Sequence, residues 1–193
     1  MAFAGSLRRR SYNRALIEAA RQLVPAGMSI DQIEIGDLPF YNADVEAEGD
    51  PDSVAAFKAA LQDANGVLIA TPEYNDGIPG VLGNALDWAS RLPGRAPLTG
   101  KPVALMGATP SLLGTARAQL HLRQVLNHIQ ARSLPPPELL VAQAHLKFDS
   151  ALRLTDPAAR QILEALLQRF SRWIARERAA SELERNWAAK SPA

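Results

Sequence analysis

The 193-residue chain contains no cysteine, so disulfide bonds, thiolate nucleophiles and thiolate metal ligands are excluded. Neither sign of charge dominates, because 21 Lys and Arg face 20 Asp and Glu. No basic stripe interleaved with aromatic residues indicates a nucleic-acid surface. No run of about 18 apolar residues could cross a bilayer, and the first residues lack the apolar core of a secretory signal. These absences predict a cytoplasmic protein that binds neither nucleic acid nor membrane.

Several common catalytic signatures are also absent. The sequence contains no GxxxxGK[ST] or GxGxxG nucleotide loop and no GxSxG nucleophile elbow. His121 and His128 are seven residues apart and share a face of one predicted helix, but no carboxylate joins them at ligand spacing. A metal site needs three or four ligands. We therefore predict no metal site.

The stretch that organises the chain is Gly66–Gly83. Val67–Ala70 is a short apolar run that predicts a fully buried strand. Thr71–Pro79 then combines Pro, Gly, Asn and Asp, which is typical of a loop. Pro79 suits the first turn of a helix, and apolar residues follow it at helical spacing. A buried strand therefore delivers a stiff polar loop that continues into a helix.

The rest of the chain repeats this alternation of strand and helix. Strands are expected at residues 1–4, 28–35, 67–70 and 103–106, with a short or broken one within 134–141. Helices are expected at residues 14–24, 50–64, 79–89, 116–129 and from 155 onward, with loops at 36–49, 91–102, 107–114 and 147–154. This predicts a three-layer α/β/α sandwich, flavodoxin-like, with a five-stranded parallel sheet of order 2-1-3-4-5. Residues 1–175 would form one domain and 176–193 a charged C-terminal extension.

The loop after the first strand carries donors that suit an anion. Ser6, Arg8, Ser11 and Asn13 precede a predicted helix N-terminus, whose free N–H groups and dipole favour negative charge. An Arg fork matches a phosphate. The alternative interpretation is a capped turn with solvated arginines.

Two further loops would lie beside it. After the central strand, Pro72, Tyr74 and Asn75 could cover one side of a flat ring, or form an ordinary strand-to-helix turn. After the next strand, Thr109 and Ser111 belong to a small polar loop that allows close approach of a ligand. Because these strands are neighbours in the predicted sheet, the three loops together indicate a phosphorylated planar ligand.

Four motifs resemble those of the NAD(P)H-dependent FMN reductases, which include bacterial chromate, quinone and azo-dye reductases. They are GSLRRRSYN at residues 5–13, PEYNDGIPGVLGNALDW at 72–88, KPVALMGATP at 101–110 and GTARAQLHLRQVL at 114–126. They stand in the family's order and spacing, and the likeness extends to about residue 175.

The resemblance implies a cofactor and an activity. The FMN phosphate would contact Ser6, Arg8, Ser11, Tyr12 and Asn13, and the isoalloxazine ring would contact Pro72, Glu73, Tyr74, Asn75 and Thr109. Hydride would pass from NADPH or NADH to FMN, and electrons would then pass to a quinone, azo dye, chromate or free flavin. The cofactor would carry this chemistry, so no side chain need act as acid, base or nucleophile. The alternatives are a non-enzymatic electron carrier or flavin-binding regulator on the same fold, and a nucleotide-binding domain without flavin.

The resemblance also implies a homodimer or homotetramer with the flavin near a subunit interface. The face around the helix at residues 116–129 mixes apolar and basic side chains, which suits an interface. These side chains are Leu112, Leu113, Arg117, Leu120, His121 and Arg123. Glu138 could pair with an arginine across the interface.

Overall fold

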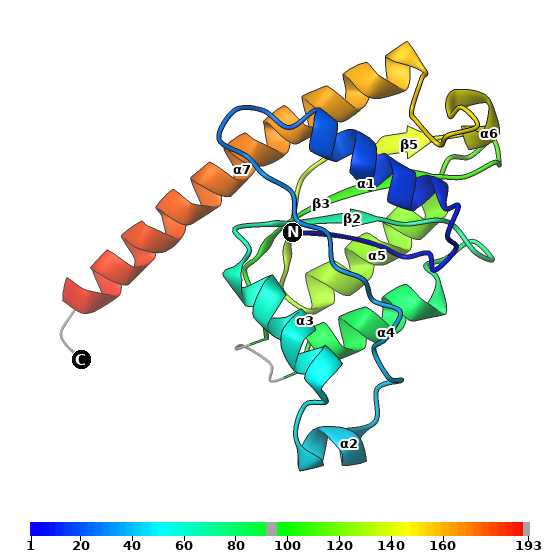
Figure 1. Cartoon of the computed structure of the whole chain (residues 1–193). Helices are drawn as coiled ribbons and strands as arrows, with labels where there is room; N and C mark the ends of the chain where they lie inside the picture. The colour runs from blue at the N-terminus through cyan, green and yellow to red at the C-terminus, as the bar shows by residue number, and fades with distance from the viewer. Residues whose placement is uncertain (92–95, 191–193) are drawn as a thin grey trace.

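The computed structural model describes residues 1–91 and 96–190, in which a parallel β-sheet lies between two layers of helices (Figure 1). The strands are β1 (Ala2–Ala4), β2 (Val67–Ala70), β3 (Pro102–Ala108), β4 (Arg132–Ser133) and β5 (Leu139–Val141). β2 lies between β1 and β3, and β4 and β5 both pair with β3 at successive positions along its length. All of these pairs are parallel. The predicted α/β/α class is confirmed.

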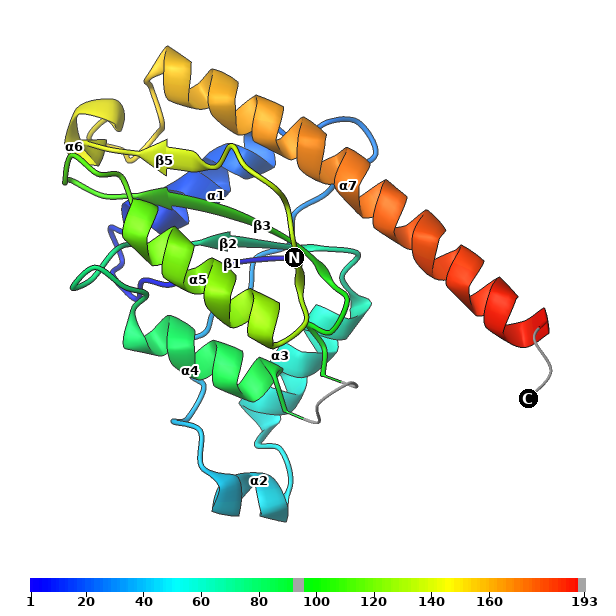
Figure 2. The ribbon, with the colours of Figure 1, turned by 180° about the vertical axis from the view of Figure 1, so that it is seen from behind.

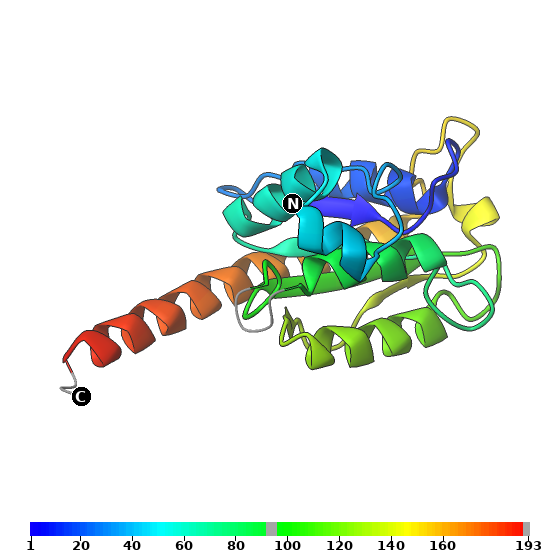
Figure 3. The same ribbon diagram turned by 90° about the horizontal axis from the view of Figure 1, so that it is seen from below.

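The helices are α1 (Tyr12–Gln22), α2 (Ala43–Glu48), α3 (Asp52–Asp63), α4 (Gly80–Ala89), α5 (Ala116–His128), α6 (Ala144–Lys147) and α7 (Pro157–Lys190). α1 and α7 cover one face of the sheet, and α3, α4 and α5 cover the other (Figures 1, 2 and 3). Side chains of β2 alternate between the two cores: Leu68 packs in the core with α1 and α7, and Ile69 in the core with α3, α4 and α5. This period of two is the expected pattern for a strand buried on both faces.

The strand predicted at residues 28–35 is wrong. This segment makes one isolated bridge, between Ala2 and Gln32, formed when Ala2 N donates to Asp31 O at 2.7 Å and Ile33 N donates to Ala2 O at 2.9 Å. β1 has only three residues, and alternate residues of a strand point their N–H and C=O groups to opposite edges, so little of this edge is available for pairing. The predicted strand order 2-1-3-4-5 is therefore not the observed one, because its first member is not a strand.

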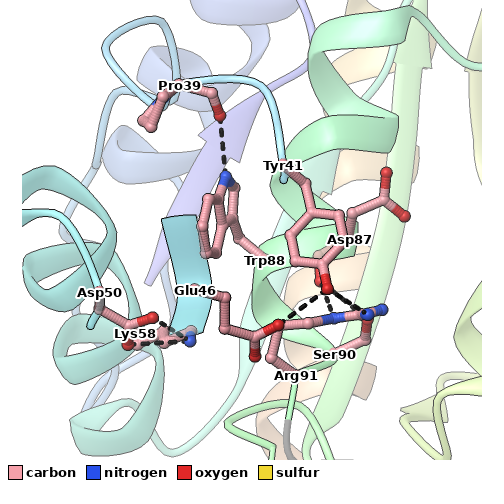
Figure 4. A network of polar contacts seen from close by, with 9 residues as sticks. All are labelled: Pro39, Tyr41, Glu46, Asp50, Lys58, Asp87, Trp88, Ser90 and Arg91. Atoms are coloured by element: carbon pink, nitrogen blue, oxygen red, sulfur yellow. Dashed lines mark hydrogen bonds and ion pairs between the residues drawn. The ribbon is translucent and has the colours of Figure 1, made fainter. Parts of the chain in front are cut away.

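The segment predicted as a loop over residues 36–49 contains the six-residue helix α2, which buries no residue. The loop before it is held against α4 by a polar network (Figure 4). Trp88 Nε1 donates to Pro39 O at 2.8 Å, and Tyr41 Oη donates to Glu46 Oε2 at 2.8 Å. Arg91 Nη1 donates to Tyr41 Oη at 3.1 Å. A short helix without buried side chains leaves no apolar periodicity in the sequence, which is why it was missed.

Other boundaries differ by small amounts. α1 begins two residues earlier than predicted, β3 continues through Ala108, and α6 precedes the predicted connector. The strand expected within 134–141 is short, as predicted, and is β5, whereas β4 lies wholly before that range. Part of the predicted loop at 91–102, residues 92–95, lies outside the described residues.

The helix α7 has 34 residues, which corresponds to a length of roughly 51 Å. Its first half packs on the sheet through Leu163, Leu167 and Phe170, and its second half projects beyond the body of the molecule (Figures 1 and 2). The predicted boundary at residues 175 and 176 falls inside this continuous helix, so the division into domain and extension stays a prediction. Across the described part of the chain, no helix is both long and apolar enough to cross a membrane.

Candidate functional site

The candidate site lies at the carboxyl ends of β1, β2 and β3, where α1 and α5 begin (Figure 2). The ladder brings these ends together: Gly5 N donates to Ala70 O at 2.9 Å, and Thr71 N donates to Met106 O at 3.0 Å. Most of the buried polar side chains gather at this edge. They are Ser6, Ser11, Asn13, Thr71, Thr109 and Thr115. An edge of a sheet with so many buried polar groups is suited to binding a polar ligand.

The loop after β1 is open toward an anion. Among the residues that the structure describes, no acceptor takes a hydrogen bond from the backbone N–H groups of residues 6–10. Ser11 caps α1, because its Oγ accepts from Asn13 N at 3.2 Å and from Arg14 N at 3.4 Å. Arg8 and Arg9 are exposed, and Arg10 Nη2 donates to Ser150 O at 2.8 Å. The loop therefore offers a run of donors beside a helix N-terminus.

Two of the predicted phosphate contacts have structural partners. Both polar atoms of the Asn13 side chain bond the backbone of Ala108: Nδ2 donates to its O and Oδ1 accepts from its N, both at 2.9 Å. The centroid of the Tyr12 ring lies 5.2 Å from the centroid of the Phe148 ring. Asn13 thus joins the start of α1 to the end of β3, and its side chain shapes the loop.

The loop after β2 forms a tight turn. Tyr74 and Gly77 exchange backbone hydrogen bonds of 3.0 Å in both directions, and the residues between them, Asn75 and Asp76, have φ of 50° and 61°. This is the pattern of a two-residue turn with both central residues left-handed. Pro72 is buried, whereas Tyr74 is 49% exposed and presents its ring to solvent. The turn therefore holds an aromatic side chain in an accessible position.

This turn is attached to α5 through three contacts. Glu73 Oε2 accepts from Ala118 N at 2.9 Å, and His121 Nδ1 accepts from Ile78 N at 3.4 Å. Asp76 forms an ion pair with Arg117, and this hydrogen bond raises the pKa of the guanidinium. Sequence reasoning missed the attachment. The signal was available, since α5 follows Gly114 and Thr115 and has no acidic residue in its first turn.

The third loop is packed closely behind the other two. A Cβ on Gly107 would lie 2.0 Å from Thr115 Oγ1 and 2.5 Å from Thr71 O, so only glycine fits here. Thr109 is buried, donates its N–H to Val141 O at 3.0 Å and accepts from Ala144 N at 3.0 Å. These contacts fix the end of β3 to the segment that follows β5.

Other features of the molecule lie away from this edge. A cavity of about 360 Å³ lies near the amino ends of the strands, lined by residues that include Met1, Asn65 and Phe170. It shares no residue with the three loops. In the described portion of the chain, no group of three or more His, Asp or Glu side chains could hold a metal ion.

Comparison with known proteins identifies the family. The model of the family described as NADPH-dependent FMN reductase matches residues 1–146. The chain belongs to this family. An NAD(P)H-dependent FMN reductase of Pseudomonas aeruginosa is 45% identical over 178 residues, which cover 92% of this chain and 96% of that protein. A 2-hydroxy-1,4-benzoquinone reductase of Burkholderia is 39% identical over 170 residues, with coverage of 88% and 92%.

A solved structure supports the same family and fold. FerB, a flavoenzyme NAD(P)H:(acceptor) oxidoreductase from Paracoccus denitrificans, superposes with a TM-score of 0.83 at 34% sequence identity. The superposition covers 91% of this chain and 96% of that one. The flavodoxin-like class and the family expected from the four motifs are both confirmed.

Proposed function

We infer that the protein is an FMN-dependent oxidoreductase that uses NAD(P)H to reduce a quinone-type acceptor. Its family and its relatives, which are named FMN and benzoquinone reductases, support this activity. The structural observation that carries the inference is the loop before α1, whose N–H groups at residues 6–10 have no acceptor within the described chain. Consecutive free N–H groups ahead of a helix form a binding site for a phosphate.

The residues of this chain would hold the two ends of FMN. Ser6, Arg8, Ser11 and Tyr12 would contact the phosphate together with the open N–H groups, and Asn13 would keep the loop in shape through Ala108. The charge-assisted bonds of an Arg fork add to this attraction.

The ring would lie against the second and third loops. Pro72, Tyr74 and Asn75 would contact it from the turn, with Glu73 fastened behind them, and Thr109 from the end of β3. When bound, FMN supplies the hydride and electron chemistry. The chain's own part is to fix the ring, to leave one face accessible and to direct backbone N–H groups at it.

The finer points of this function are also proposals. NADPH and NADH are both candidate donors, and the exposed Arg9 beside the phosphate loop would favour a donor carrying a 2′-phosphate. Quinones are the proposed acceptors, with azo dyes, chromate and free flavin as further candidates. We also propose a cytoplasmic location.

The proposed assembly is a homodimer or homotetramer formed through α5 and the loop before it. Leu112, Leu113 and Leu120 are 78%, 52% and 64% exposed there, which is unusual for three apolar side chains on one face. Glu138, expected to pair across the interface, is bonded at 2.9 Å to Arg123 of its own chain. Light scattering should give a mass above the 20.8 kDa of one chain at micromolar concentration. A mass near 20.8 kDa would reject the assembly.

The activity is tested with the visible spectrum of the purified, FMN-reconstituted protein. We expect flavin absorbance that bleaches on anaerobic addition of NADPH and returns when benzoquinone is added. Chromatography of the flavin released by denaturation should give FMN. Recovery of FAD, failure to bind any flavin, or bleaching only in the presence of a separate reductase would contradict the proposal.

A further inference from the structure

We propose that Glu73 and Asp76 are positioning residues for the flavin ring, because they fasten the turn at residues 74–77 to the first turn of α5. This inference rests on the proposed function. It assigns to Glu73 a role behind the turn, in place of the direct contact with FMN that the family motif implied.

Glu73 serves as the missing N-terminal cap of α5. The residue at the cap position, Thr115, accepts no capping hydrogen bond from the backbone N–H groups of the helix, because its Oγ1 accepts from the Gln119 side chain at 3.0 Å. Glu73 Oε2 accepts instead from Ala118 N at 2.9 Å, across 45 residues of sequence. A helix N-terminus attracts a carboxylate through its free N–H groups and its dipole. The capping bond therefore also fixes the residue that immediately precedes the exposed Tyr74.

Asp76 occupies a position where its backbone is unfavourable. Its φ of 61° is left-handed, and glycine is the usual residue at this place in a two-residue turn. The Asp76 carboxylate pairs with Arg117, which neighbours Ala118 in α5. Both partners are more than half exposed, so this pair contributes less than the Glu73 cap. The two carboxylates hold both sides of Tyr74 and Asn75 to one helix turn.

A turn held in this way acts on the ring and leaves the phosphate loop unchanged. The predicted signature is a loss of affinity that is equal for FMN and for riboflavin, which lacks the phosphate. We expect Glu73→Ala to weaken the binding of both ligands by about fivefold to tenfold, since the loss of a helix cap is typically worth most of one decade in an equilibrium constant. Glu73→Gln keeps an oxygen acceptor for Ala118 N and should remain within about threefold of the wild type. Asp76→Asn tolerates the left-handed backbone and should lower the affinity for each flavin by about threefold or less.

The experiment titrates FMN and riboflavin against each full-length variant by quenching of flavin fluorescence, and records the thermal unfolding of each ligand-free variant. Asp156→Ala is the matched control, because Asp156 Oδ1 caps α7 by accepting from Ala159 N at 2.8 Å and contacts none of the three loops. It should lower the unfolding temperature as Glu73→Ala does and leave both flavin affinities unchanged.

Three results would overturn the inference while leaving the proposed function in place. They are a Glu73→Ala variant with wild-type affinities, a loss confined to FMN, and a Glu73→Gln variant as weak as Glu73→Ala. A wild-type protein that binds neither flavin would reject the proposed function, and this inference with it.

Discussion

Two helices begin at the same edge of the sheet, and their N-termini are treated differently. α1 is capped by Ser11 from its own loop, and the preceding N–H groups at residues 6–10 have no acceptor among the described residues. α5 has no side-chain cap of its own, and Glu73 brings a carboxylate to it from the neighbouring loop. One helix end remains available to an external anion, and the other already has an internal one.

This difference indicates how one site can bind the two ends of an amphipathic ligand. A phosphate supplies strong acceptors, so the loop that meets it can leave its donors unsatisfied until the ligand arrives. The acceptors of a flat ring are uncharged and weaker, so the loop that meets the ring must be ordered by the protein itself. A helix N-terminus is thus open to a phosphate when no carboxylate of the chain already caps it.

The largest expected effect is a loss of stability when the close packing between the loop after β2 and the start of α5 is disturbed. Gly107→Ala places a Cβ 2.0 Å from Thr115 Oγ1 and 2.5 Å from Thr71 O, and the second contact is with backbone that cannot rotate away. We expect the free energy of unfolding to fall by about 3 kcal/mol, at the upper end of typical overpacking costs. Urea unfolding followed by circular dichroism measures this loss.

Gly83→Ala is the control for that substitution. No atom lies within 4 Å of a Cβ built on Gly83, which is in the interior of α4. Replacing a helical glycine by alanine should stabilise the protein by about 0.5–1 kcal/mol. If both alanine variants changed stability in the same direction, close packing behind the two loops would not explain the result.

The next largest effect is a loss of affinity for the FMN phosphate alone. Arg8→Ala removes charge-assisted bonds worth about 1.5–3 kcal/mol, so FMN affinity should fall roughly tenfold to a hundredfold while riboflavin affinity barely changes. Arg9→Ala is the control, because Arg9 is exposed, whereas Arg10 Nη2 donates to the Ser150 carbonyl. Fluorescence titration of both flavins provides the measurement. Equal losses for FMN and riboflavin would mean a disturbed loop and would contradict the phosphate assignment.

The smallest effect concerns the cap of α1. Ser11→Ala removes the Oγ that accepts from Asn13 N and Arg14 N, and should lower the free energy of unfolding by about 1 kcal/mol. A bound phosphate can replace part of this cap, so excess FMN should restore more stability to the variant than riboflavin does. Thermal unfolding with each flavin tests this. An equal shift with both ligands would show that phosphate does not reach the helix end.

Much of this arrangement could be predicted from local sequence signals. The apolar run Val67–Ala70 and the Pro-rich loop after it gave β2 and its turn, and the loop before α1 was correctly expected to lead into a helix N-terminus. What could not be predicted depends on long-range contacts. Glu73 is hydrogen-bonded to Ala118, 45 residues away in sequence, and Asn13 to Ala108, 95 residues away. The segment at 28–35 has strand-like residues, but it makes a single bridge to β1, which has only three residues.

The projecting half of α7 has a consequence for amide hydrogen exchange. Leu163 and Phe170 are buried against the sheet, whereas Leu183, farther along the same helix, is 71% exposed. A helix without tertiary packing is only marginally stable in water. Exchange should therefore be slowest near Phe170 and accelerate steadily toward Leu183, so that one unbroken helix spans the range from global to local opening. Deuterium uptake along α7 would then show how far from the core, in residues, its packing still slows amide exchange.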